Sequence, residues 1–370
     1  RDANGTEEHF YGLGAAPTNG FNTVDWRNRT YDLWMLDTGV HAITPLYYST
    51  AGYGIYLNNS NKGSISFRST CSIEVEGGEL DYYFIYGPSF QNIQSDFGEL
   101  CGTMAMPPLS SLGLTYRGAL NFTDQQLITA IEDFQKAGIA VDTVGVEPGW
   151  QTATYPCTYV WSNKFPNPAT FIESIHNLGV KVNLWEHPFV SEKSPIYNQI
   201  LPYSLTSNTL SVNAEDKNYG FEGLVPDFTL PQAKEIYWNI HKENLASIGV
   251  DGFKIDETDS WVCGSELDIT FPGGLSANAY HNIMGTLTVN NIAERYKTEY
   301  NKRIFTFSRG NYTGMQRYAT TAYSDTYGFS QYLMTVIAQS YAGTYFTPEV
   351  RGASTSNDID YMRRTQMMFM

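Results

Sequence analysis

The segment 249–259, Gly-Val-Asp-Gly-Phe-Lys-Ile-Asp-Glu-Thr-Asp, joins a short apolar strand to a carboxylate-rich end. Residues two apart in a strand share a face, so Lys254 and Asp256 point one way while Phe253 and Ile255 point the other. A cation beside a carboxylate at a strand end favours an ionised, nucleophilic Asp256. A surface ion pair would give the same pattern, so the remaining sequence has to discriminate between the two.

The composition is that of a soluble, acidic globular protein. The 370 residues are 42% hydrophobic and 16% charged, with a net charge of -15. This charge argues against nucleic acid or an anionic membrane surface as a partner, and no apolar run could span a bilayer. The chain contains 27 Tyr, 20 Phe and 7 Trp; aromatic faces suit sugars, although most of them fill cores.

The cysteines and the ends of the chain give further expectations. Cys71, Cys101, Cys157 and Cys263 form no CxxC pair, so no zinc site is expected, and bridged or free thiols remain open. Five Asn-x-Ser/Thr sequons favour a secreted, periplasmic or lumenal location over a cytoplasmic one. The chain begins without Met and stops within an apolar run, which predicts a fragment truncated at both ends.

Two domains are predicted, 1–105 and 106–370. Short β runs broken by Gly and Asn, with no long helical period, predict an antiparallel β-sandwich up to residue 105, incomplete at its start. The segment 106–108, Met-Pro-Pro, marks the boundary because paired prolines stop regular structure.

Helices and strands alternate after the boundary. Helices are expected near 123–138, 168–178, 231–248, 277–296 and 329–341, and strands near 112–116, 141–146, 180–185, 250–255, 303–307, 320–324 and 344–346. Repeated βα units imply a parallel sheet covered by helices. No glycine-rich phosphate loop follows any strand, so a (β/α)8 TIM-type barrel lacking its last unit fits this α/β pattern better than an open sheet.

Carboxylates and aromatic residues gather at the carboxyl ends of these strands, where barrel enzymes carry their active sites. The candidate site residues are Glu147, Trp150, Trp185, Lys254, Asp256, Arg309, Asp325, Glu349 and Arg351. Two carboxylates facing each other across a cavity suit acetal cleavage. His187 has no metal-binding context and no Gly-x-Ser-x-Gly elbow occurs, so neither a metal, another cofactor nor a serine nucleophile is expected.

Several motifs together resemble glycoside hydrolase family 31, the α-glucosidase and α-xylosidase family. Gly252-Phe-Lys-Ile-Asp256 is similar to its nucleophile motif. Further motifs occur in the family's order at 8–14, 80–88, 106–113, 161–168, 308–309, 316–317 and 325. The resemblance implies an N-terminal sandwich followed by a catalytic barrel, and an oligosaccharide or glycoside as substrate.

The resemblance also implies roles for individual residues. Asp256 would be the nucleophile and Asp325 the general acid/base of a retaining double displacement. Lys254 and Arg309 would hold sugar hydroxyls and tune the nucleophile. Trp150 and Trp185 would be aromatic walls, together with Phe253, which the strand alternation turns towards the core instead.

Two positions depart from the family pattern. Glu147 stands where glucoside-cleaving members carry an Asp that grips O4 of the sugar, and 347–352, Thr-Pro-Glu-Val-Arg-Gly, replaces a His-Asp-Ile-Gly-Gly motif. Glu349 or Arg351 would then substitute for the missing His. A longer carboxylate near O4 suits an axial hydroxyl, so an exo-acting α-galactosidase is suspected, with an α-glucosidase as the other reading. A transglycosylase, an α-glucan lyase and a non-catalytic sugar-binding relative remain alternatives.

Overall fold

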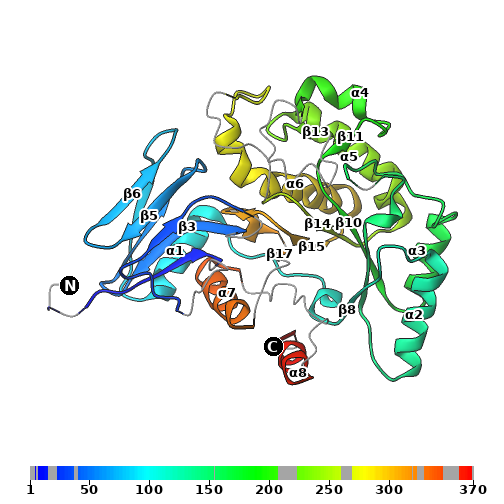
Figure 1. The fold of residues 1–370 in the computed structure, drawn as a ribbon, viewed down its shortest axis with the longest axis horizontal. Coiled ribbons are helices and arrows are strands. Elements are labelled where there is room, and N and C mark those ends of the chain that lie inside the picture. The colour runs from blue at the N-terminus through cyan, green and yellow to red at the C-terminus, as the bar shows by residue number, and fades with distance from the viewer. Residues whose placement is uncertain are drawn as a thin grey trace.

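The computed structural model describes residues 5, 7–15, 23–36, 41–153, 155–206, 223–259, 269–318, 320–322, 329–344 and 358–368. An antiparallel part lies beside a larger part in which helices cover a curled parallel sheet (Figure 1). The N-terminal part holds β1 (Phe10–Gly14), β2 (Thr30–Asp32), β3 (Ala42–Ser49), β4 (Tyr53–Leu57), β5 (Gly63–Phe67), β6 (Cys71–Val75), β7 (Tyr82–Tyr86) and α1 (Phe90–Cys101).

The N-terminal part is built from two sheets, one in the order β1-β3-β4-β7 and one in the order β2-β5-β6. Their pairings within each sheet are antiparallel. Alternate residues of β4, Ile55 and Leu57, enter a core shared with Ile65 and Phe67 of β5. The predicted antiparallel sandwich is confirmed.

Helix α1 was not predicted, because the sequence before residue 105 has no long helical period. Ser89 caps this helix by accepting a hydrogen bond from the backbone N–H of Asn92. Ile93, Phe97 and Cys101 are its buried residues and lie four apart, the spacing of one helix face. They cover the face of the sheet opposite to the sandwich core, so this short apolar repeat was the overlooked signal.

The second part follows the predicted alternation. It holds α2 (Asp124–Lys136), α3 (Pro168–Asn177), α4 (Tyr197–Ile200), α5 (Pro231–Asn244), α6 (Ala277–Tyr300), α7 (Phe329–Tyr341) and α8 (Asp358–Met368), with strands β8 (Thr115–Arg117), β9 (Thr143–Val146), β10 (Lys181–Glu186), β14 (Gly252–Ile255), β15 (Phe305–Ser308) and β17 (Thr320–Ala322). These strands form one sheet in the order β17-β15-β14-β10-β9-β8, paired in parallel. The barrel-type α/β fold is confirmed, while residues 345–346 of the expected seventh strand lie outside the described part of the chain.

Local sequence explains where several helices begin. Thr123 and Gln126 form a capping box at the start of α2, and Pro168 and Pro231 begin α3 and α5, where a missing N–H costs nothing. The loops add elements that the sequence did not predict, namely a small sheet of β11 (Val190–Ser191), β12 (Ser204–Thr206) and β13 (Gly223–Pro226) beside α4.

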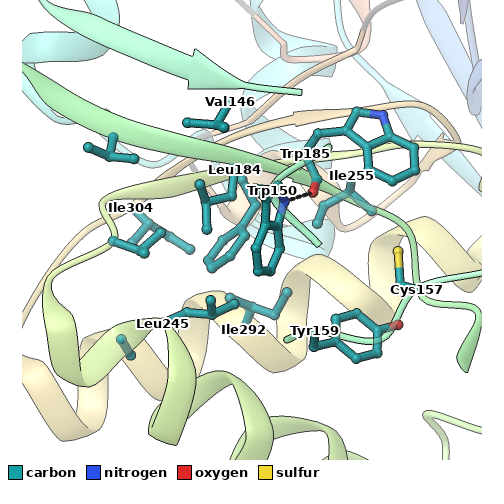
Figure 2. Packing of buried hydrophobic residues seen from close by; sticks show 14 of the residues in the cluster. Val146, Trp150, Cys157, Tyr159, Leu184, Trp185, Leu245, Ile255, Ile292 and Ile304 are labelled. Atoms are coloured by element: carbon teal, nitrogen blue, oxygen red, sulfur yellow. Dashed lines mark hydrogen bonds between the residues drawn. The ribbon is translucent and has the colours of Figure 1, made fainter. Parts of the chain in front are cut away.

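The main core lies between the outer face of the parallel sheet and its helices (Figure 2). Leu184, Phe253 and Ile255 point into this layer, against Ile292 and Tyr296 of α6. Phe253 therefore faces the core, as the alternation predicted, and Lys254 and Asp256 are left on the inner face of the sheet.

The two parts are joined by backbone hydrogen bonds next to Arg309. Strand β16 (Asn311–Tyr312) pairs in parallel with β3, and the carbonyl of His41 accepts from the N–H groups of Gly310 and Asn311, each at 3.1 Å. Asn282 of α6 donates to the carbonyls of Leu33 and Ser60. These contacts fix the position of the chain that follows β15.

Candidate active site

Polar side chains occupy the inner face of the sheet near the carboxyl ends of its strands. Trp185 of β10 lies in register with Lys254 of β14, and Lys254 with Phe307 of β15. Asp256 follows Lys254 by two residues and therefore lies on the same face. Glu147 follows β9, two residues after Gly145, and Gly145 is in register with Asn183 of β10. Glu147 thus also lies on the inner face. The fold thus gathers residues that are up to 160 positions apart in the chain, counted from Glu147 to Phe307.

Asp256 is 6% exposed and is held by donors from three directions. Its Oδ2 accepts from the indole Nε1 of Trp185 at 2.6 Å. Its Oδ1 accepts from Arg309 Nη1 at 3.1 Å and from the backbone N–H of Glu257 at 2.9 Å. Hydrogen bonds to an ionised oxygen are the strong kind and favour the charged form, so this carboxyl is built to act as a carboxylate.

The guanidinium of Arg309 contacts three carboxylates. Its Nε lies 3.1 and 3.2 Å from the two oxygens of Asp259, and its Nη1 lies 3.6 Å from Glu257 in addition to the Asp256 contact. The Arg309 side chain is 3% exposed and that of Asp259 1%. A planar guanidinium with five donors suits such shared binding, which a Lys could not reproduce.

An aromatic wall stands beside Asp256. The ring of Tyr155 lies 5.0 Å from that of Trp185 and 5.6 Å from that of His187. Burial raises the pKa of Tyr155 well above its ordinary range, and the nearby charges of Asp256, Glu257 and Glu147 raise it further. The Tyr155 phenol therefore lies within the field of both the strand β14 carboxylates and Glu147.

His187 is fully buried in the same wall. Its Nδ1 accepts from the backbone N–H of Phe189 at 3.2 Å, so its Nε2 carries the hydrogen, and that atom has no partner within the described ranges. Burial lowers the pKa of His187 to about 3, although the charge of Asp256 acts in the opposite direction. His187 is therefore a neutral hydrogen-bond donor at neutral pH.

Glu147 is oriented by an arginine that the sequence analysis did not single out. Arg117, at the end of β8, donates from Nε to Glu147 Oε1 and from Nη1 to Asn183 Oδ1, the latter at 3.0 Å. The Glu147 side chain is 20% exposed and that of Arg117 13%. The Glu147 carboxylate is thus held in place by Arg117 while part of its side chain stays exposed to solvent.

The structure places the predicted residues as follows. Asp256, Trp185, Arg309 and Lys254 come together on the inner face, with Glu147 on the same face two strands away. Asp325, Glu349 and Arg351 lie outside the described residues. Their roles stay predictions.

Trp150 requires a correction. It is fully buried in the core layer outside the sheet, where its indole Nε1 donates to the carbonyl of Trp185 at 2.7 Å (Figure 2). Its ring lies 4.8 Å from that of Trp161. The short 3-10 turn at Pro148–Trp150 places this side chain in the hydrophobic core. Tyr155, five residues later, is the residue of this connection whose ring lies beside Trp185 and His187.

The sequence signals for the overlooked residues were weak. Arg117 ends the first barrel strand, so it met the same strand-end criterion as the chosen residues. Tyr155 lies in an irregular loop and had no signal. No group of three His, Cys, Asp or Glu side chains among the described residues is arranged to hold a metal ion.

Comparison with known proteins assigns the chain to a family. Residues 104–350 match the family model described as Glycosyl hydrolases family 31 TIM-barrel domain. Because this match covers more than half of the chain, the protein belongs to glycoside hydrolase family 31. The resemblance drawn from the motifs is therefore confirmed.

Individual relatives support this assignment. Alpha-xylosidase XylQ of Lactiplantibacillus pentosus is 30% identical over 266 residues, which are 68% of this chain and 34% of that protein. A Flavobacterium johnsoniae GH31 dextranase complexed with glucose superposes with a TM-score of 0.74 at 25% identity, covering 86% of this chain and 41% of the dextranase. The chain thus spans about a third of the length of XylQ.

A third relative is similar in fold alone. A GH31 α-xylosidase from a soil metagenome, complexed with xylose, gives a TM-score of 0.83 at 17% identity and covers 98% of this chain and 54% of that enzyme. Among the helices of the described residues, none has the length and apolar character needed to cross a membrane.

Proposed function

We propose that the full-length protein is a retaining, exo-acting α-glycosidase. The observation that carries this proposal is Asp256, a buried carboxylate at the end of β14 that is held by Trp185 and Arg309 in a family 31 barrel. A carboxylate oriented by charge-assisted hydrogen bonds on the inner face of a barrel suits nucleophilic attack on an anomeric carbon.

The proposed reaction has two steps. In the first, an oxygen of Asp256 forms a bond to C1 while the bond from C1 to the leaving oxygen breaks, and Asp325 gives its proton to that oxygen. In the second, Asp325 takes a proton from water, whose oxygen bonds to C1 as the bond from C1 to Asp256 breaks. Two inversions at C1 retain the α configuration. Asp325 must be protonated at rest and Asp256 ionised.

The charge balance of the site supports this chemistry. Asp256, Glu257 and Asp259 carry three negative charges, whereas Arg309 and Lys254 carry two positive ones. Both Asp256 and Lys254 are 6% exposed, so water screens these charges only weakly. A net negative site stabilises the positive charge that develops on the sugar ring in an oxocarbenium-like transition state.

The sugar is proposed from the relatives. XylQ is an α-xylosidase, and the similar dextranase was crystallised with glucose, so a terminal α-linked xyloside or glucoside is the leading candidate. An α-galactoside is the second candidate, because Glu147 is a longer carboxylate that Arg117 aims into the site. A panel of aryl α-xylosides, α-glucosides and α-galactosides ranks the three.

The same panel, run on the full-length protein and on Asp256→Ala, tests the function. Hydrolysis predicts a reducing sugar whose first-formed anomer is α, detected by proton NMR, and no activity in the variant. Larger oligosaccharides would indicate transfer, and an unsaturated sugar a lyase. A full-length protein that binds these glycosides but releases no product would contradict the proposal.

A further inference from the structure

A polar row crosses the inner face of the sheet one layer below the site. The pairing register places Arg117, Gly145, Asn183, Gly252 and Phe305 side by side on strands β8, β9, β10, β14 and β15. Arg117 Nη1 donates to Asn183 Oδ1 at 3.0 Å, and Asn183 Nδ2 donates to the carbonyl of Phe305 at 3.4 Å. The Arg117 side chain thereby reaches Asn183 across β9, and the Asn183 side chain reaches the backbone of β15 across β14.

The two glycines make this row possible. A Cβ on Gly145 would lie 2.5 Å from Arg117 Nη1, and a Cβ on Gly252 would lie 3.1 Å from Asn183 Nδ2 and 2.3 Å from the carbonyl oxygen of Phe305. Any other residue would push the guanidinium and the amide off the sheet. The guanidinium of Arg117 therefore lies across the backbone of β9, in a place that only glycine leaves free.

The row ends at Glu147, the carboxylate that we expect to face the sugar. With Nη1 engaged by Asn183, the Nε of Arg117 points to Glu147 Oε1. No second partner of Glu147 exists in the part of the chain that the structure describes, and the side chain is 20% exposed. Oε2 is thus open to a ligand. Glu147 follows β9 and Asp256 follows β14 on the same face of the sheet, with Trp185 of β10, which donates to Asp256, on the strand between them.

We propose that Arg117 is a specificity-determining positioning residue: held by Asn183 over Gly145, it aims Glu147 at one hydroxyl of the bound sugar. The inference rests on the proposed function and deepens it. An aimed carboxylate accepts a hydrogen bond from a hydroxyl of one orientation, whereas a carboxylate on a loose side chain would tolerate both epimers. Arg117 does not touch the reacting atoms.

The test measures kcat and KM for the full-length protein and its variants Arg117→Met and Glu147→Gln, on the preferred aryl α-glycoside and on its monodeoxy analogues. Arg117→Met is expected to lower kcat/KM on the parent glycoside about 10- to 100-fold, chiefly through KM. On the analogue that lacks the hydroxyl read by Glu147, the same variant is expected to equal the wild type. The double variant is expected to be no worse than Glu147→Gln alone.

Controls separate positioning from folding and from a failure of the proposed function. Arg295→Met removes an arginine that pairs with Glu235 and Glu299 on the outer helices, and it should leave every ratio unchanged. If Arg117→Met does not fold, Arg117→Lys, which keeps the charge but cannot reach both Glu147 and Asn183, is judged by the same criteria. A loss of equal size on every deoxy analogue, or strictly additive single variants, would overturn the inference while the wild type remains active; a wild type inactive on all glycosides would instead overturn the proposed function.

Discussion

Two buried carboxylates lie at the ends of neighbouring strands, and they face opposite sides of the sheet. Asp256 follows β14 on the inner face, and Glu186 ends β10 on the outer face. They are 6% and 0% exposed, and the backbone N–H of Asp256 donates to the carbonyl of Glu186 at 2.8 Å. Two residues of the same chemistry, tied by one hydrogen bond, therefore occupy two different environments.

The carboxylate of Glu186 is surrounded by protein groups that occupy both of its oxygens. Its two oxygens lie 3.0 and 2.9 Å from His241 Nε2, and Tyr237 donates its hydroxyl at 3.1 Å. His241 Nδ1 lies 2.7 Å from the Tyr237 carbonyl; since a carbonyl only accepts, Nδ1 carries a hydrogen, and a second proton lies between Nε2 and Glu186. This network joins β10 to α5 within the core.

Asp256 is bound by groups that also face the space inside the barrel. Its main cation, Arg309, is shared with Asp259 and Glu257. Burial alone therefore does not mark a catalytic carboxylate. What distinguishes Asp256 is the face of the sheet: one residue of register separates the carboxylate of the proposed active site from one enclosed in the core.

The largest contrast should appear in activity when each carboxylate is removed. Asp256→Ala is expected to lower kcat on the order of 10^4- to 10^6-fold, because a nucleophile has no substitute in a double displacement. Glu186→Gln keeps the shape and the hydrogen-bonding groups and is expected to retain most of the activity. Steady-state kinetics on an aryl α-glycoside would check both, and comparable losses in the two variants would remove the distinction.

For the free energy of unfolding, the Glu186 network on the outer face is expected to matter most. His241→Leu leaves Glu186 buried without its hydrogen-bond partner, so the free energy of unfolding is expected to fall by about 3–5 kcal/mol. Replacing both residues, as Glu186→Leu with His241→Phe, should cost less, because no unpaired charge remains. Urea denaturation of the three proteins measures this, and an equal or greater loss in the double variant would refute the paired network.

The hydrogen bond from Trp185 to Asp256 is expected to matter for activity. Trp185→Phe removes a donor at 2.6 Å from Asp256, the proposed nucleophile, and is expected to lower kcat/KM about 10- to 100-fold. Trp161→Phe is a matched control, since it also removes an indole donor, here to the carbonyl of Asn244 at 3.0 Å. Similar kinetic losses in both variants would point to packing and not to the nucleophile.

His187 gives the smallest effect, a pH dependence of stability. Its pKa is about 3 in the folded protein and 6.5 ordinarily, so between these values the unfolded chain binds a proton that the folded one does not. Stability should therefore fall as the pH drops below 6.5, approaching about 1.4 kcal/mol per pH unit from this group. His187→Gln should reduce that slope in urea denaturation between pH 7 and 5, whereas an unchanged slope would mean that His187 is not buried neutral.

The sequence could predict most of the barrel because its signals are local. Strand alternation placed Phe253 and Asp256 on opposite faces, and capping residues and prolines marked the starts of α2, α3 and α5. Helix α1 was missed because its apolar repeat, Ile93, Phe97 and Cys101, is short and follows a β-rich segment.

The site could be predicted only in part, because its details depend on contacts between distant segments. Trp150 and Tyr155 lie in the same irregular connection, and sequence alone could not say which of them turns towards the inner face. Arg117 acquires its meaning only through the register that places it beside Gly145 and Asn183. The closed environment of Glu186 likewise requires His241, which is 55 residues away.

Trapping of the covalent intermediate would show directly whether Asp256 is the nucleophile. A 5-fluoro glycosyl fluoride of the preferred sugar slows the second step, so the full-length protein should accumulate a glycosyl ester that peptide mass spectrometry can locate. The added mass is expected on Asp256, within the peptide that contains residues 252–259, and none is expected in Asp256→Ala. A label on Glu186 or on any other carboxylate, with Asp256 unmodified in an active protein, would contradict it.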